Sequence, residues 1–217
     1  MNKIFLYLSF LLPIIFASCS HEKKDSENGK PIELKEAKEQ IIIDCNYTFD
    51  EAIAGSVAPE YILNQLELID VLYYSIDNKV HAGQILTNKK MVPVLKHMFE
   101  FMYEKQFPIG RAIPIVKFKW NDDLSMKANN TYSFCYRNAG YSKHATGMAI
   151  DINPYFNPVR WKDAFKNRTN KPVGAIYNPK VPGTFYPENP VNIEFKKCGL
   201  RWGHSFTRNW DDHHFEK

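Results

Sequence analysis

Residues 66–102 read LELIDVLYYSIDNKVHAGQILTNKKMVPVLKHMFEFM, which contains the patterns of a β-hairpin and of a helix. The run 66–74 is rich in β-branched and aromatic residues, and a second such run passes through residues 82–86 after the turn-forming pair Asp77-Asn78. Apolar side chains then recur at spacings of three and four, as in one stripe of a helix of roughly four turns. That stripe consists of Met91, Val94, Leu95, Met98 and Met102. We therefore predict a hairpin followed by a helix that ends before Pro108.

Further along the chain, residues 113–118 have the composition of another strand, closed by the turn-forming sequence Asn121-Asp122-Asp123. Between positions 153 and 190 there are seven prolines and little periodicity, which is typical of a long structured loop. No repeat or Pro/Gly/Ser linker divides residues 45–217. Short strands alternating with one or two helices predict an α+β fold, with a small, mainly antiparallel sheet and flanking helices.

The N-terminus has the layout of an export signal. Lys3 supplies a positive charge, residues 4–16 are apolar, and two small residues precede Cys19. The sequence Phe-Ala-Ser-Cys over residues 16–19 resembles a bacterial lipobox, in which the cysteine is lipidated and becomes the first residue of the mature chain. Acyl chains on Cys19 would anchor the protein to a membrane without spanning it.

These features predict a lipoprotein-type signal peptide over residues 1–18, a lipid-anchored polar tether over 19–44 and one domain over 45–217. We expect the protein in the bacterial cell envelope, on the periplasmic or outer-membrane side. We expect it to be a monomer.

Its three remaining cysteines share no C-x-x-C spacing, and one pair could form a disulfide in an oxidising compartment. They are Cys45, Cys135 and Cys198.

The composition excludes several classes of protein. With 44% hydrophobic and 24% charged residues over 217 positions, the chain is neither disordered nor a multi-span membrane protein. Its net charge of +4 is small, and it has no stripe of Lys and Arg interleaved with stacking aromatics. We therefore expect no nucleic-acid partner.

Two segments concentrate side chains that can bind a metal. The first is SKHATGMAIDIN, residues 142–153. If residues 148–153 form a strand, Ile150 packs on the core while Asp151 faces a cleft. His144 lies seven positions before Asp151 and would point the other way on a continuous strand, but Gly147 lets the chain turn between them. That turn could bring both side chains onto one metal.

The second segment is WGHSF at residues 202–206, followed by DDHHFE at 211–216. Phe215 between polar neighbours predicts a short strand held against the core. A catalytic zinc needs about three protein ligands and an open water position. The candidate ligands are His144, Asp151 and either His213 or His214. Asp211 or Glu216 is placed to act as general base. Such a metal lowers the pKa of its water and polarises a carbonyl, which suits amide hydrolysis. Two His and one carboxylate also form the triad of non-haem iron oxygenases.

The patterns SxHxxGxAxD at residues 142–151 and DxxHFE at 211–216 resemble the signature of zinc D-Ala-D-Ala carboxypeptidases and dipeptidases (VanY and VanX types) and L-alanyl-D-glutamate endolysins. The sequences NTYSFCYR at 130–137 and AIDINP at 149–154 are most similar to the VanY-like branch. The resemblance implies the Hedgehog/DD-peptidase-like α+β fold.

The resemblance also assigns roles to individual residues. It implies zinc ligands at His144, Asp151 and His214, a general acid/base at Asp211, and a substrate or oxyanion contact at Arg137. Ser142 and Glu216 would orient the ligands. Where relatives tend to read Trp-Gly-Gly-Asp/Glu-Trp, this chain has WGHSF. The acid and Trp that are replaced here by Ser205 and Phe206 belong to the expected cleft wall. His204 is a candidate substrate contact, and Trp202 is a candidate for contacting the substrate or orienting the ligands.

We therefore expect a zinc-dependent peptidase that acts on peptidoglycan stem peptides, of the D-Ala-D-Ala carboxypeptidase or L-Ala-D-Glu endopeptidase type. The alternative is a catalytically inactive cell-wall-binding lipoprotein that retains a structural zinc site. Asp211 argues against this alternative, because a structural site needs no base beside an open position.

Overall fold

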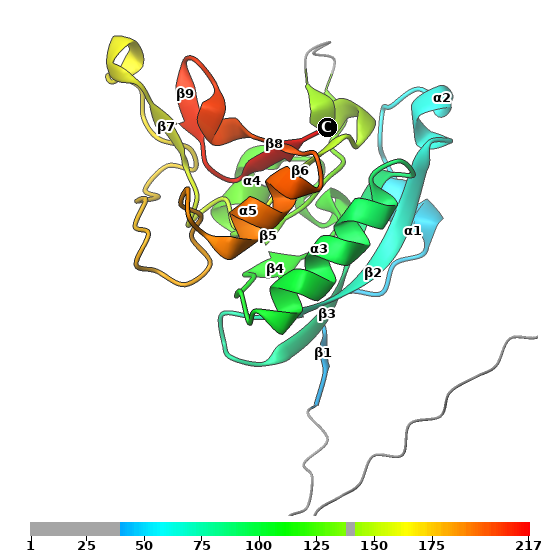
Figure 1. Cartoon of the computed structure of the whole chain (residues 1–217). Helices are drawn as coiled ribbons and strands as arrows, with labels where there is room; N and C mark the ends of the chain where they lie inside the picture. The colour runs from blue at the N-terminus through cyan, green and yellow to red at the C-terminus, as the bar shows by residue number, and fades with distance from the viewer. Residues whose placement is uncertain (1–39, 138–141) are drawn as a thin grey trace, which may run out of the picture. The chain divides into compact units, whose positions relative to one another are not determined.

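The computed structural model describes residues 40–137 and 142–217 (Figure 1). The expected signal peptide, the lipidation site Cys19 and most of the expected tether lie outside these residues. Within the described ranges, no helix has the length and apolar character needed to cross a membrane. Cys45, Cys135 and Cys198 are free thiols in this part of the chain, so none of them forms the disulfide that the sequence allowed.

The expected α+β class is confirmed, because the described residues form short helices and several small, mostly antiparallel sheets. In chain order, with η for a 3₁₀-helix, the elements are β1 (Ile42–Ile43), α1 (Phe49–Ile53), α2 (Glu60–Leu63), β2 (Leu66–Tyr74), β3 (Val80–Asn88), α3 (Val92–Glu104), β4 (Arg111–Ala112), η1 (Ile115–Phe118), α4 (Asp122–Lys127), β5 (Asn130–Thr131), η2 (Lys143–Thr146), β6 (Ala149–Asp151), β7 (Val159–Trp161), η3 (Asp163–Phe165), α5 (Pro190–Lys197), β8 (Arg201–Trp202), η4 (Gly203–Ser205), β9 (Asn209–Asp211) and β10 (His214–Glu216).

The hairpin and the helix that follows it form as predicted. Strands β2 and β3 pair along their whole length, from Leu66 opposite Asn88 to Tyr74 opposite Val80. Helix α3 then packs across the hairpin (Figure 1), because its apolar stripe meets the inward side chains of both strands. Leu95 of α3 is fully buried in this core.

Strand β1 adds a third strand to this sheet and pairs in parallel with β3. Its residues belong to the segment that we assigned to the tether, so the folded domain begins a few positions before residue 45. The next residue, Asp44, fixes this strand from its end, because its carboxylate binds the Tyr73 hydroxyl and lies 3.0 Å from Nδ1 of His81.

The strand predicted over residues 113–118 is wrong: this segment forms η1. Pro114 precedes η1 with a φ of −53°, and Lys119 and Trp120 after it have φ of 54° and 59°, so the chain coils instead of extending. The predicted turn at residues 121–123 is the start of helix α4, because the Asn121 side chain accepts a hydrogen bond from the Leu124 amide.

A second sheet, with strand order β6-β10-β8, carries the candidate site. Phe215 of β10 forms the predicted short strand and faces the core, where its ring stacks on Phe195 of α5 at a centroid distance of 4.2 Å. The segment 153–190 is mostly irregular, as expected, but contains β7, which pairs antiparallel with β9. The C-terminal segment therefore pairs with the loop through β9 and forms the central strand of the second sheet through β10.

Candidate metal centre

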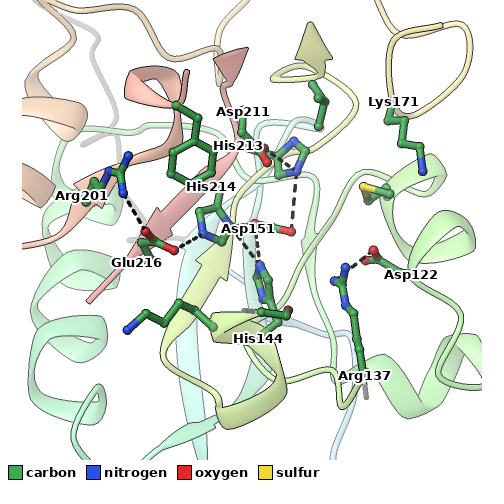
Figure 2. Close-up of a pocket in the computed structure, with 15 residues that line it drawn as sticks. Asp122, Arg137, His144, Asp151, Lys171, Arg201, Asp211, His213, His214 and Glu216 are labelled. Atoms are coloured by element: carbon green, nitrogen blue, oxygen red, sulfur yellow. Dashed lines mark hydrogen bonds and ion pairs between the residues drawn. The ribbon is translucent and has the colours of Figure 1, made fainter. Parts of the chain in front are cut away.

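Three predicted metal-binding side chains converge on one point (Figure 2). His144 Nε2 lies 3.0 Å from Asp151 Oδ1 and 3.0 Å from His214 Nδ1, and that His214 nitrogen lies 3.0 Å from the same Asp151 oxygen. All three residues are buried. The register of the second sheet explains part of this convergence, since His214 of β10 lies directly opposite Asp151 of β6.

His144 reaches the same point because the chain turns at Gly147, as predicted. Gly147 ends η2 with a φ of 68°, in the left-handed region that favours glycine. A Cβ at this position would lie 2.7 Å from the backbone nitrogen of Asn88. The turn therefore requires glycine for its conformation and for its close approach to β3.

Groups outside the triad fix the tautomers of both histidines. The Nδ1–H of His144 donates to the carbonyl oxygen of Ser133 at 2.7 Å, which leaves the Nε2 lone pair facing Asp151. His214 Nε2 lies 3.2 Å from Oε2 of Glu216, and Arg201 lies 3.5 Å from the other carboxylate oxygen of Glu216. The expected orienting role therefore has a geometric basis for Glu216. Ser142 lines the pocket, and the Ser133 carbonyl orients His144 instead.

The charges of this cluster suit a cation. Burial would raise the pKa of Asp151, but His144 and His213 outweigh burial and hold that pKa well below its ordinary value. Burial likewise opposes a charge on His214, yet hydrogen bonds to Asp151 and Glu216 raise its pKa to about 10. Without a metal, the cluster therefore holds a carboxylate and a proton on a ligand nitrogen. A divalent cation can replace that proton.

The donor set fits zinc. Two neutral imidazole nitrogens and one carboxylate oxygen are ligands that zinc takes in catalytic sites, and both rings have a partner that leaves the converging nitrogen available. Within the described residues, His144, Asp151 and His214 form one of two groups with ligand atoms close enough to share an ion. His214 completes this group, whereas His213 lies beside it.

His213 connects the triad to the expected general base. Its Nδ1–H donates to the carbonyl oxygen of Asn157 at 2.6 Å. Its Nε2 lies 3.0 Å from Asp211 Oδ1 and 3.6 Å from Asp151 Oδ2. His213 Nε2 and Asp211 Oδ1 are close enough for an ion pair, but the N–H is not aligned with the oxygen as a hydrogen bond requires. Asp211 is partly exposed and lines the pocket, so its carboxylate faces the space in front of the triad.

Arg137 lies on another wall of the same pocket (Figure 2). Its guanidinium is 3.0 Å from a carboxylate oxygen of Asp122 and donates to the Tyr132 hydroxyl at 3.1 Å. The Tyr132 ring stacks on His144, with centroids 5.2 Å apart. No pattern in the sequence identified Asp122 or Tyr132 as partners of Arg137. The pocket has a volume of about 470 Å³. Four basic side chains line it, namely Arg137, Lys143, Lys171 and Arg201.

Trp202 and His204 do not line this pocket. The two rings stack with centroids 4.4 Å apart, and His204 Nδ1 lies 2.6 Å from a carboxylate oxygen of Asp212. The indole N–H of Trp202 donates to the Asp212 carbonyl at 2.9 Å. Both residues therefore support the turn between β9 and β10, whereas we expected them to contact the substrate or orient the ligands. Phe206, at the position of the lost Trp, does line the pocket as expected.

The fold and the converging side chains describe an α+β domain with a candidate metal centre. Residues 136–217, which include all three converging side chains, match a family model described as D-alanyl-D-alanine carboxypeptidase. The resemblance to the D-Ala-D-Ala carboxypeptidase family is thus confirmed over this part of the chain, and the match supports a peptidase.

The chain is also similar to a fructan 6-exohydrolase of Triticum aestivum, with 35% identity over 72 residues. That overlap covers 32% of this chain and 11% of the relative, so the chain spans a small part of that enzyme. No solved structure matches the chain.

Proposed function

We propose that the protein is a zinc-dependent peptidase that hydrolyses peptide bonds of peptidoglycan stem peptides, of the D-Ala-D-Ala carboxypeptidase or L-Ala-D-Glu endopeptidase type. The observation that carries the proposal is the convergence of His144, Asp151 and His214 at the pocket, inside the segment that matches the family model. The similarity of residues 130–137 and 149–154 to the VanY-like branch supports the carboxypeptidase type.

In this proposal, His144, Asp151 and His214 hold the zinc ion. A zinc ion held there would polarise the scissile carbonyl and lower the pKa of a coordinated water. Ser133 and Glu216 keep both histidines in the required tautomer, through the contacts at 2.7 Å and 3.2 Å described above. These two contacts reduce the reorganisation needed at the site.

Asp211 is the proposed general acid/base. It lines the pocket and is about one-fifth exposed, so its carboxylate can reach both solvent and a bound peptide. It would accept a proton from the attacking water and later return that proton to the leaving amine nitrogen. His213 lies between the carboxylates of Asp211 and Asp151 and would restrict the orientation of Asp211.

Arg137 is the proposed contact for a substrate carboxylate or for the developing oxyanion. A guanidinium suits both tasks because its N–H groups form a planar fork. Asp122 and Tyr132 hold the side chain in place, so little conformational freedom is lost when a peptide binds. Four basic and four acidic side chains line the pocket, so its charge alone does not select anionic peptides.

We also propose that the protein is exported and anchored in the cell envelope by acylation of Cys19. The layout of residues 1–19 supports this location, and so does the proposed substrate, which lies outside the cytoplasmic membrane. The proposal includes a monomeric protein without a nucleic-acid partner.

The test combines metal content with cleavage of purified muropeptides. We expect about one zinc at this site and a product whose mass identifies the cleaved bond. His144→Ala should lose the zinc at this site and the product. Asp211→Asn should retain zinc and lose about 10²–10⁴-fold in kcat. Asp163→Asn is the matched control, because Asp163 is an exposed aspartate in η3, outside the pocket.

The result can also overturn the proposal. Full activity of Asp211→Asn with zinc bound would exclude Asp211 as the general base. Zinc without any product from the unmodified protein would favour the inactive wall-binding alternative. Stoichiometric iron would instead favour the oxygenase chemistry of the same ligand types.

A further inference from the structure

A second group of potential metal ligands lies where helices α3 and α5 meet, and it shares no residue with the proposed active site. It consists of His97 on α3, Glu194 on α5, and Cys198, the residue that caps the C-terminus of α5. One ligand atom from each residue lies within 4.8 Å of the other two. Figure 1 shows the two helices side by side, and they are in contact.

The donor atoms differ in type and lie close together. His97 Nε2 lies 3.0 Å from Glu194 Oε1. Lys197 approaches the other carboxylate oxygen, Oε2, at 3.4 Å, so Oε1 remains directed at the imidazole. In the metal-free protein a proton on His97 Nε2 links the two groups, and a metal ion can take the place of that proton.

The thiol of Cys198 distinguishes this group from an ordinary surface ion pair. An exposed His–Glu pair contributes little to stability and needs no explanation. Here a sulfur atom completes a set of imidazole nitrogen, carboxylate oxygen and thiolate, which are the three ligand types that zinc takes in proteins. Zinc bonds are about 2.0 Å to nitrogen and about 2.3 Å to sulfur, so the group must contract slightly to bind.

The surroundings permit that contraction. The side chain of His97 is about half exposed, and Cys198 is partly exposed at the end of its helix. Helix α5 is short, with Asn189 capping its N-terminus and Phe195 packed on Phe215. A metal bound by residues of both helices would connect α5 to α3 at the outer edge of the core.

We propose that His97, Glu194 and Cys198 form a second, structural site for a divalent metal ion of the zinc class, which clamps α5 onto α3. The fourth position is open to water. This site is independent of the proposed peptidase activity, because its residues lie on α3 and α5 and none of them lines the active-site pocket.

Cobalt(II) separates the two sites, because only the second site offers sulfur. We expect the purified protein to bind about two cobalt ions per chain, and one of them to give a near-ultraviolet sulfur-to-cobalt charge-transfer band. Cys198→Ser should bind one ion fewer and lose the band while keeping any muropeptide cleavage. His144→Ala should retain the band, because it affects only the first site. Cys45→Ser is the matched control and should leave the band unchanged.

A stability measurement tests the clamp itself. In the His144→Ala background, zinc at a hundredfold excess over its Kd should raise Tm by about 5 °C or more, and the additional change Cys198→Ser should abolish the rise. If Cys198→Ser does not fold, His97→Ala replaces it, since that side chain is about half exposed. The proposal is overturned if the unmodified protein shows no sulfur-to-cobalt band, or if the band persists in Cys198→Ser. Either result of this test leaves the proposed peptidase site unaffected, and failure of the peptidase proposal would leave the second metal site unaffected.

Discussion

Gly147→Ala tests whether the turn after His144 assembles the metal centre. Gly147 has a φ of 68°, and a Cβ there would lie 2.7 Å from the Asn88 amide nitrogen and 3.1 Å from Cδ2 of Leu66. The leucine side chain can move, but the amide belongs to strand β3 and also donates to the Gly147 carbonyl. The clash must therefore displace the turn and, with it, His144.

The magnitude has two parts. A non-glycine residue in the left-handed region costs about 1–2 kcal/mol. Overpacking against backbone that cannot relax freely adds about 1–3 kcal/mol. Gly199→Ala carries only the first part, because Gly199 has a similar φ of 82° and no atom within 4 Å of an added Cβ. The difference in stability between the two variants therefore isolates the overpacking part. The entropy that alanine removes from the unfolded chain is the same in both variants and cancels in the difference.

The assay is urea unfolding of both variants, together with zinc titration. Gly147→Ala should be less stable than Gly199→Ala by about 1–3 kcal/mol, which corresponds to about 2–12 °C in Tm. Displacement of His144 should also weaken zinc binding at this site by about 10–100-fold, and Gly199→Ala should leave it unchanged. Equal stability and equal zinc affinity of the two variants would refute the argument that this turn builds the site.

Three further results are expected. Zinc uptake near pH 7 should release about one proton from the cluster, because burial is outweighed by hydrogen bonds that raise the pKa of His214 to about 10, and His214 must be neutral to bind zinc. The apparent zinc affinity should therefore rise from pH 6 to pH 8. Calorimetry in buffers of different ionisation enthalpy measures the released proton, and binding heats that do not depend on the buffer would contradict the prediction. Glu216→Gln should weaken zinc binding about 10–100-fold by loosening His214, whereas the exposed control Glu188→Gln should not. Phe195→Ala should cost about 3–5 kcal/mol of stability in urea unfolding, because its buried ring stacks on Phe215, whereas the more exposed Ile193→Ala on the same helix should cost less than about 2 kcal/mol.

Periodic patterns made the β2–β3 hairpin and helix α3 predictable, whereas strands defined by pairing between distant segments were not. The β2–β3 hairpin and α3 follow from local periodicity, because one face of each element must be buried. Strand β1 has only two residues and is defined by its pairing with β3, so no local pattern marks it. The β-branched and aromatic composition of residues 113–118 favoured a strand. Pro114 before η1 and two left-handed residues directly after η1 instead produce a 3₁₀-helix.

The converging side chains of the candidate metal centre were predictable because their residue types are rare and chemically specific. Their orienting partners were only partly predictable. Glu216 is a carboxylate two positions after His214, which a sequence can suggest. The partner of His144 is the backbone carbonyl of Ser133, a group that every residue carries, so only the folded chain identifies it.

His204 shows how a departure from a family pattern can serve structure. Asp212 has no solvent exposure, and a buried carboxylate is costly unless its oxygens are paired. His204 lies 2.6 Å from one oxygen, and Arg160 donates to the other at 2.6 Å. The turn that Asp212 anchors separates Asp211 from His214, so this buried pairing fixes the distance between the proposed general base and a proposed metal ligand. His204, where the family pattern has glycine, therefore supports the turn that carries Asp212.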